Sequence, residues 1–213
     1  MQRAVNRIVP GVVLAVVLAS CASTPSPSAS PHASATALAS RQYTTTAFVM
    51  PLTVTVGPLL KSPPTADDSN LVSWDAASSA NEKVGFLIPV EVYQPGSSTP
   101  QAPPRHYIEY LQGLAGQGAA FSKVTTIRVG AYAATLMTAT TTRIMDGSLG
   151  CPVKGADAGS GCFGLQPEFS LRIAVIEVSP EMTFVAWART GADSPDPAFD
   201  AMFEAMLASV KFS

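Results

Sequence analysis

The chain has 213 residues, of which 13% are charged, and its formal net charge at pH 7 is −2. Its 15 acidic residues outnumber its 13 basic residues, and the basic residues do not cluster. Because binding to a phosphate backbone needs clustered Lys and Arg side chains, this composition argues against a nucleic-acid partner. The length suits one domain with a well-buried core.

The first 20 residues have the three parts of a secretory signal peptide. Arg3 and Arg7 form the positively charged part, residues 8–19 form the apolar part, and small residues lie at its end. The apolar run is shorter than the roughly 20 residues that a membrane-spanning helix needs, and Pro10 interrupts it. We therefore expect residues 1–20 to be a cleaved leader. Its removal leaves 11 basic and 15 acidic residues, a net charge of −4.

The segment Leu18-Ala19-Ser20-Cys21 resembles the bacterial lipobox. The resemblance implies that the Cys21 thiol receives a diacylglyceryl group and that cleavage makes Cys21 the first mature residue. Two acyl chains suffice for stable anchoring, whereas one chain binds only marginally. We expect the protein to lie on the extracytoplasmic side, held by lipid in the outer leaflet of the cell membrane. The alternative is an ordinary signal peptide with Cys21 near the cut by chance.

A low-complexity segment follows the lipid attachment site. Residues 22–40 consist almost wholly of Ala, Ser, Thr and Pro. Such a segment has too little apolar bulk to pack and is typical of a flexible tether. We expect a tether over residues 21–42 and a single globular domain over residues 43–213.

Cys151 and Cys162 are the cysteines that remain once Cys21 is assigned to the lipid. In an oxidising compartment an even pair indicates a disulfide. A closed loop of this size would stabilise the fold by roughly 3 kcal/mol in the chain-entropy account. A metal or redox site is the alternative, but the spacing is not Cys-x-x-Cys and no histidine is near in the sequence.

Alternation of apolar and polar residues, many of them β-branched, predicts a series of strands. The expected strands cover residues 52–56, 71–74, 83–88, 90–93, 125–129, 132–142, 171–178, 182–189 and 209–212. The segment Ser179-Pro180-Glu181 predicts a hairpin turn, and Asp146-Gly147 predicts a turn before the Cys151–Cys162 loop.

Two helices are predicted. The first has Pro104 in its first turn and apolar residues at three- and four-residue steps from Tyr107 to Ala115. The second has Asp196 as N-cap and Pro197 at its first position. Few strands alternate with helices, so the expected fold class is α+β, a largely antiparallel sheet packed by helices.

The order of these elements carries a resemblance. Its residues are Pro51 to Val56, Pro104-Arg105-His106-Tyr107, Val129-Gly130-Ala131-Tyr132, the hairpin from Arg172 to Trp187, and the ending Phe203 to Phe212. They are similar to the small actinobacterial envelope lipoproteins with a PsbP-like α/β/α sandwich, over most of residues 43–213. The resemblance implies an antiparallel sheet between helices, and a binding or assembly role rather than catalysis. It assigns no functional residue.

The sequence contains no pattern that predicts a catalytic residue, a metal site or a cofactor. His106 and Glu109 lie one helical turn apart, but a metal site needs three or four ligands. The Gly-x-Ser-x-Gly elbow of hydrolases is absent. The glycine-rich residues 113–118 end a helix rather than open one, unlike a phosphate loop. Asp146 and Asp157 lack the dense oxygen ligands of calcium loops.

Trp74, Tyr93 and Trp187 are the aromatic residues best suited to line a ligand pocket, with burial in the core as the alternative. The expected function is non-enzymatic binding of an envelope protein, or of an apolar or cell-wall ligand. A structural or assembly role for a membrane complex is the alternative. A hydrolase of envelope material that depends on His106 is a third hypothesis.

Overall fold

The computed structural model describes residues 39–213. Cys21, the expected leader over residues 1–20 and the expected tether up to residue 38 lie outside the described residues. Over residues 39–213, no helix is both long enough and apolar enough to cross a membrane. The first strand, β1 (Arg41–Thr44), begins two residues before the expected start of the domain at residue 43. Arg41 belongs to it because it pairs with Val56, and its guanidinium donates to the Leu60 carbonyl at 2.7 Å.

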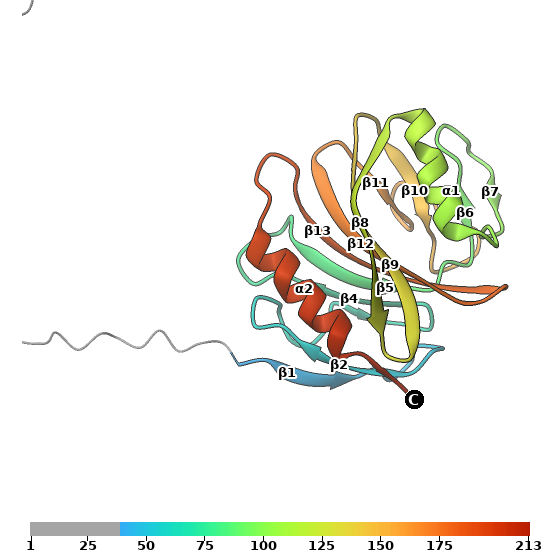
Figure 1. Ribbon diagram of the computed structural model, residues 1–213. Coiled ribbons are helices and arrows are strands. Elements are labelled where there is room, and N and C mark those ends of the chain that lie inside the picture. The colour runs from blue at the N-terminus through green and yellow to red at the C-terminus, as the bar shows by residue number, and fades with distance from the viewer. Residues whose placement is uncertain (1–38) are drawn as a thin grey trace, which may run out of the picture. The chain divides into compact units, whose positions relative to one another are not determined.

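A seven-stranded antiparallel sheet lies at the centre of the domain (Figure 1). Its strand order is β3-β4-β5-β13-β12-β9-β8. In that order the strands are β3 (Ala66–Asp67), β4 (Leu71–Asp75), β5 (Lys83–Leu87), β13 (Met182–Gly191), β12 (Phe169–Ser179), β9 (Tyr132–Thr141) and β8 (Ala119–Val129). The hairpin predicted around Ser179-Pro180-Glu181 is the central pair, β12 and β13.

Three smaller sheets accompany the large one. The first has the order β1-β2-β14, with β2 (Leu52–Val56) and β14 (Lys211–Phe212). The second pairs β10 (Met145–Gly150) with β11 (Phe163–Leu165), and the third pairs β6 (Val92–Tyr93) with β7 (Pro100–Gln101). The α+β class with a largely antiparallel sheet is confirmed, and the helices are few and short.

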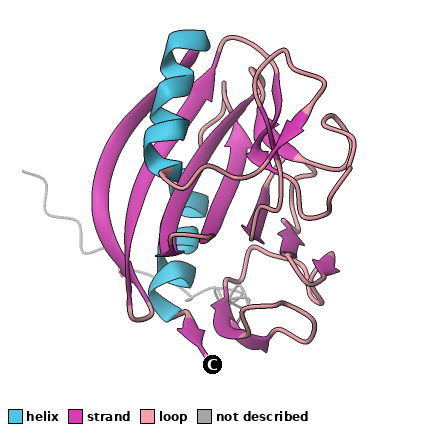
Figure 2. Cartoon of the chain, turned by 90° about the vertical axis from the view of Figure 1, so that its right-hand side faces the viewer, coloured by secondary structure: helices cyan, strands magenta, loops and turns pink. Residues whose placement is uncertain are grey.

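Each face of the seven-stranded sheet has its own hydrophobic core. In Figure 2, helix α1 (Tyr107–Gly113) lies in front of the strands and helix α2 (Pro197–Ser209) behind them. Successive residues of β13 alternate between the two cores, because strand side chains point to opposite faces. Phe184 and Ala186 therefore belong to the α2 side, and Val185 and Trp187 to the α1 side.

Helix α2 covers one face as its sequence predicts. The Asp196 side chain caps it by accepting from the Ala198 and Phe199 amides, and Pro197 follows the cap. Its buried stripe comprises Phe199, Met202, Phe203, Met206 and Leu207. Arg172 of β12, only 8% exposed, fastens the helix to the sheet through a 2.9 Å ion pair with Glu204.

Helix α1 covers the other face but begins at Tyr107, three residues after Pro104. Its start coincides with a tertiary contact, since the Tyr107 amide donates to the Glu177 carboxylate of β12 at 3.1 Å. The Tyr107 and Tyr110 hydroxyls donate to carbonyls of β10 at 2.7 and 3.0 Å. A 3₁₀ turn, η1 (Leu114–Gln117), continues α1, and Gly118 ends it in a left-handed conformation.

The turn predicted at Asp146-Gly147 is wrong, because both residues lie inside strand β10. Gly147 has a φ of +72°, and a Cβ at this position would lie 2.7 Å from the Tyr93 ring. The glycine allows β10 to pass close to Tyr93, so it serves a close approach rather than a chain reversal.

Asp67 of β3 connects the three-stranded sheet to the seven-stranded sheet. Its Oδ2 accepts from the Tyr43 hydroxyl of β1 at 2.5 Å, and from the amide and hydroxyl of Thr46 at 2.8 and 2.7 Å. Burial alone would raise the pKa of Asp67, but these hydrogen bonds lower it below its usual value. The pKa of Tyr43 rises to about 12, through burial and then through the bond to Asp67.

We predict that Asp67→Asn lowers the free energy of unfolding at pH 7 by about 1 kcal/mol, since charge-assisted bonds at a partly exposed site are lost. Because the pKa of Asp67 is lower in the folded state, its charge stabilises the fold at pH values above its unfolded-state pKa near 3.9. This contribution disappears as the pH falls through the folded-state pKa. The difference between wild type and variant should therefore be constant from pH 5 to 7 and shrink below pH 4. Urea titrations against pH measure it, with Asp193→Asn in an exposed loop as control. An unchanged difference at pH 3 would contradict the prediction.

Candidate functional site

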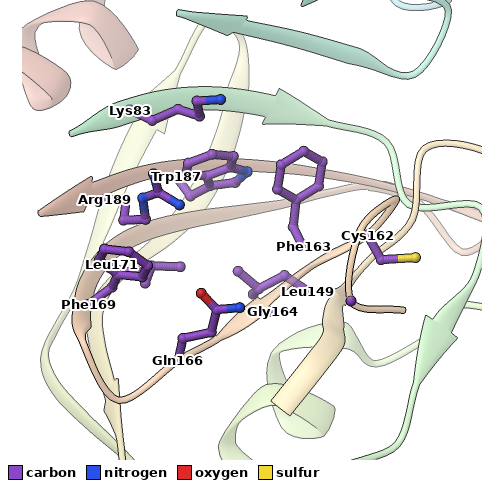
Figure 3. Close-up of a pocket in the computed structure, with 11 residues that line it drawn as sticks. Lys83, Leu149, Cys162, Phe163, Gly164, Gln166, Phe169, Leu171, Trp187 and Arg189 are labelled. Carbon is purple, nitrogen blue, oxygen red and sulfur yellow. The ribbon is translucent and has the colours of Figure 1, made fainter. Parts of the chain in front are cut away.

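A cavity of about 170 Å³ opens on the α1 side of the central sheet, away from α1 itself (Figure 3). We call it the Trp187 cavity. Strands β5, β13 and β12 form its floor with Lys83, Trp187, Arg189, Phe169 and Leu171. Strands β10 and β11 and the segments beside β11 form its other wall, with Leu149, Gly159, Cys162, Phe163, Gly164 and Gln166.

Trp187 lies flat over a glycine of the neighbouring strand. It is paired in register with Gly85 of β5, and a Cβ on Gly85 would lie 2.4 Å from the indole Cζ2. The absence of a side chain at residue 85 therefore creates the space that the indole occupies. Phe163 of β11 covers the indole from the cavity side, with ring centroids 5.1 Å apart.

The indole Nε1 of Trp187 is buried and has no hydrogen-bond partner within residues 39–213. In Figure 3 this nitrogen lies at the end of the indole that faces Phe163, away from Arg189. One other buried side-chain atom of the described residues lacks a partner, Asp67 Oδ1. Asp67 makes three bonds through its other oxygen, whereas an indole has only one polar atom. Trp187 is thus a buried donor with its whole hydrogen-bonding capacity unused.

Arg189 brings a positive charge to the cavity without a carboxylate partner among the described residues. Its Nε and Nη2 donate to the carbonyls of Asn81 and Ala80 at 2.8 and 3.4 Å. Its guanidinium lies 4.2 Å from the centroid of the Phe169 ring. Burial lowers the pKa of Arg189, and the more distant Asp75 and Glu168 raise it. A guanidinium stays protonated at neutral pH in any case.

Lys83 is the second cation at this end of the cavity. Its ammonium group forms a 2.9 Å ion pair with Asp75 of β4, with both side chains 27% exposed. Burial raises the pKa of Asp75, but the hydrogen bond and charge of Lys83 lower it overall. An ammonium group has three donors, so the ion pair leaves donors of Lys83 for a ligand.

The predicted disulfide between Cys151 and Cys162 is confirmed, and its loop borders the cavity. The Tyr93 hydroxyl donates to the Ala156 carbonyl of this loop at 2.8 Å. The Glu91 carboxylate accepts from the Gly155 amide at 2.7 Å. These contacts and the disulfide hold Gly159 and Cys162 in place as part of the cavity wall.

The three aromatic residues proposed from the sequence lie at different places. Trp187 lines the cavity. Trp74 lies in the core on the α2 side, 1% exposed, with an edge-to-face contact to Phe86. Tyr93 is 6% exposed and supports the disulfide loop from outside the cavity. The fold thus does not bring the three together.

His106, the histidine considered for catalysis or metal binding, stands at the N-cap position of α1 without a side-chain capping bond, and it does not line the Trp187 cavity. In the part of the chain that the structure describes, no three His, Cys, Asp or Glu residues are grouped so that they could hold a metal ion. The cavity walls contain no serine, histidine or carboxylate, and their one cysteine is in the disulfide.

Sequence reasoning missed Gly85, Arg189 and Phe163. Gly85 stands between Val84 and Phe86 inside a strand, and such a glycine signals a close approach of another group. Arg189 is the last residue of the strand predicted over residues 182–189, and an arginine at a strand end is as easily explained by exposure to solvent. Phe163 follows the disulfide directly, and nothing in its local pattern indicates that it packs on Trp187.

No known protein family matches the chain, and no curated protein matches it either. Eleven chains of solved structures do match. One of them is the crystal structure of a protein from Bacteroides thetaiotaomicron VPI-5482 at 1.50 Å resolution. It has a TM-score of 0.39 and 5% identity, over 76% of this chain and 45% of that chain. This chain therefore corresponds to less than half of that one, and the similarity carries no conclusion about fold or function.

We predict that Gly85→Ala lowers the free energy of unfolding by about 1–3 kcal/mol, because the new methyl group overlaps the indole of Trp187 and forces it to move. Gly113→Ala is the matched control, since a Cβ there meets nothing within 4 Å and the residue is helical. The control should be neutral or stabilising by up to about 1 kcal/mol. Urea denaturation of both variants measures this. Equal stability of the two would show that Trp187 does not press on Gly85.

Proposed function

We propose that this chain is a lipid-anchored binding protein on the extracytoplasmic side of the cell membrane, which holds a small ligand in the Trp187 cavity. The sequence Leu18-Ala19-Ser20-Cys21 supports the anchor. The Ala, Ser, Thr and Pro composition that follows supports a tether between lipid and domain. Such an arrangement keeps a binding domain at the membrane surface with freedom to reach its ligand.

The observation that carries the binding role is the unused donor of Trp187. A buried donor without a partner costs about 1–3 kcal/mol. Trp187 is 2% exposed, yet it borders a cavity large enough for a small molecule. A ligand that moves Phe163, which covers the indole, would bring an acceptor atom to this donor and recover the free energy in the bound state.

A binding role without catalysis is supported by the chemistry of the cavity walls. A nucleophile needs an adjacent general base, and covalent catalysis needs both within hydrogen-bond reach. The polar side chains at this cavity are Lys83, Gln166, Trp187 and Arg189. They suit recognition of a ligand better than cleavage of one.

We also propose that the domain is of the PsbP-like α/β/α type. Two features support this: an antiparallel sheet with a helix on each face, and a chain order that ends in the stripe-bearing helix α2 followed by β14. The three-stranded sheet and the disulfide loop would then be local additions to that architecture.

The anchor is tested by producing the full chain in a bacterium that processes lipoproteins, beside its Cys21→Ser variant. We predict that the unchanged chain enters the detergent phase in a phase-separation assay and that its mass includes a diacylglyceryl group. The variant should enter the aqueous phase. A variant that stays with the detergent would contradict anchoring through Cys21.

Binding is tested on the full-length protein with ¹⁵N-labelled tryptophan, screened against neutral, acidic and basic single-ring compounds. The chain has two tryptophans, so Trp187→Phe assigns both indole N–H signals. We predict that a subset of compounds shifts the Trp187 signal and leaves that of Trp74 unchanged. If no compound in any charge class moves the Trp187 signal, the cavity is not a small-molecule site.

A further inference from the structure

The Trp187 cavity has a polarity that specifies the chemistry of its ligand. Resting on the proposed binding function, we propose that the ligand is a small apolar molecule with one carboxylate. The carboxylate binds between Lys83 and Arg189, and the apolar part lies against Leu149, Phe163 and Leu171.

The floor end of the cavity offers donors only. The Arg189 Nη1 forms no hydrogen bond with any of residues 39–213, and the enclosed Trp187 Nε1–H has no partner among them either. Lys83 adds an ammonium group whose charge Asp75 already balances. Arg189 forms no ion pair with a carboxylate of residues 39–213, and it lies in a partly buried place, where a ligand carboxylate would form strong charge-assisted hydrogen bonds.

The loop end of the cavity has the opposite charge. Asp146 accepts from the Gln166 amide at 3.1 Å, and its other oxygen would lie 3.5 Å from a Cβ on Gly159. Asp157 accepts three hydrogen bonds within the loop, from the Gly159 amide and from the amide and hydroxyl of Ser160. The Ser160 bonds lower the pKa of Asp157, which keeps it negative. A carboxylate ligand would be repelled here, so its head must point to the Lys83–Arg189 end.

Two aromatic faces at the cavity are already covered. Phe163 packs on the Trp187 indole at 5.1 Å, and the Arg189 guanidinium lies over Phe169 at 4.2 Å. These two faces are closed to the stacking of a carbohydrate ring. Nη1 of Arg189, which bonds to none of residues 39–213, is a donor that recognises an acceptor oxygen.

The volume limits the size of the ligand. A cavity of about 150 Å³ in another protein binds benzene, and the Trp187 cavity measures about 170 Å³. One ring with its carboxylate, or a short branched chain, fills this space. Because the cavity is open on one side, a longer ligand would place only its carboxylate end inside.

Benzoate, benzamide and benzylamine test the inference, since they share one ring and differ in charge. Each is titrated into the full-length protein at pH 7 and low salt, with calorimetry for affinity and the Trp187 indole N–H signal for location. We expect benzoate to shift that signal and to bind at least tenfold tighter than the other two. Arg189→Gln should weaken benzoate binding at least tenfold, and Arg143→Gln, an exposed arginine outside the cavity, should not.

The outcomes separate the ligand class from the binding function. If benzamide or benzylamine binds at Trp187 as tightly as benzoate, the carboxylate inference is wrong and the cavity remains a binding site. If none of the three moves the Trp187 signal while other single-ring compounds do, the inference also fails and the proposed function stands. If nothing moves it, both fail. If the Arg189→Gln variant does not fold, the comparison of benzoate with benzylamine on the unchanged protein still decides whether the cavity prefers a carboxylate.

Discussion

Burial of both faces of the β12–β13 hairpin is the constraint on which the rest of this structure depends. The two strands pair over most of their length, and residues 184–188 of β13 are all buried. A strand buried on both sides needs a separate cover for each side. Helix α2 with the three-stranded sheet covers one side, and α1 with β10 and β11 covers the other. The ion pair of Arg172 with Glu204 and the Tyr107 hydrogen bonds to β12 and β10 fix these covers in place.

The cavity arises where the second cover ends. Helix α1 reaches Leu149 through Tyr107, but the part of the sheet near Trp187 is covered by β11 and the disulfide loop instead. A loop rich in glycine packs less completely than a helix with a bulky stripe. The disulfide and the contacts of Tyr93 and Glu91 compensate by holding that loop in one position. The same loop that stabilises the fold thereby shapes the wall of the proposed binding site.

Much of the fold could be predicted from the sequence, since it depends on local patterns. The β12–β13 hairpin, the capped helix α2 and the disulfide follow from alternation, from Asp196-Pro197 and from the cysteine count. The start of α1 at Tyr107 and the passage of β10 past Tyr93 could not, because Glu177 and Tyr93 are distant in the sequence. The candidate site, too, could be predicted only in part. A large aromatic residue at 187 was a reasonable candidate, but its place in a cavity with Gly85, Phe163 and Arg189 around it could not be predicted, because only the tertiary structure brings these residues together.

The central claim is that the Trp187 cavity binds the carboxylate of a small ligand beside Arg189. A high-resolution crystal structure of the protein soaked with benzoate tests it most directly. The account predicts a carboxylate oxygen 2.7–3.2 Å from a guanidinium nitrogen of Arg189, with the ring of benzoate inside the cavity. A structure in which Phe163 or Gln166 fills the cavity and no benzoate lies beside Arg189 would contradict it.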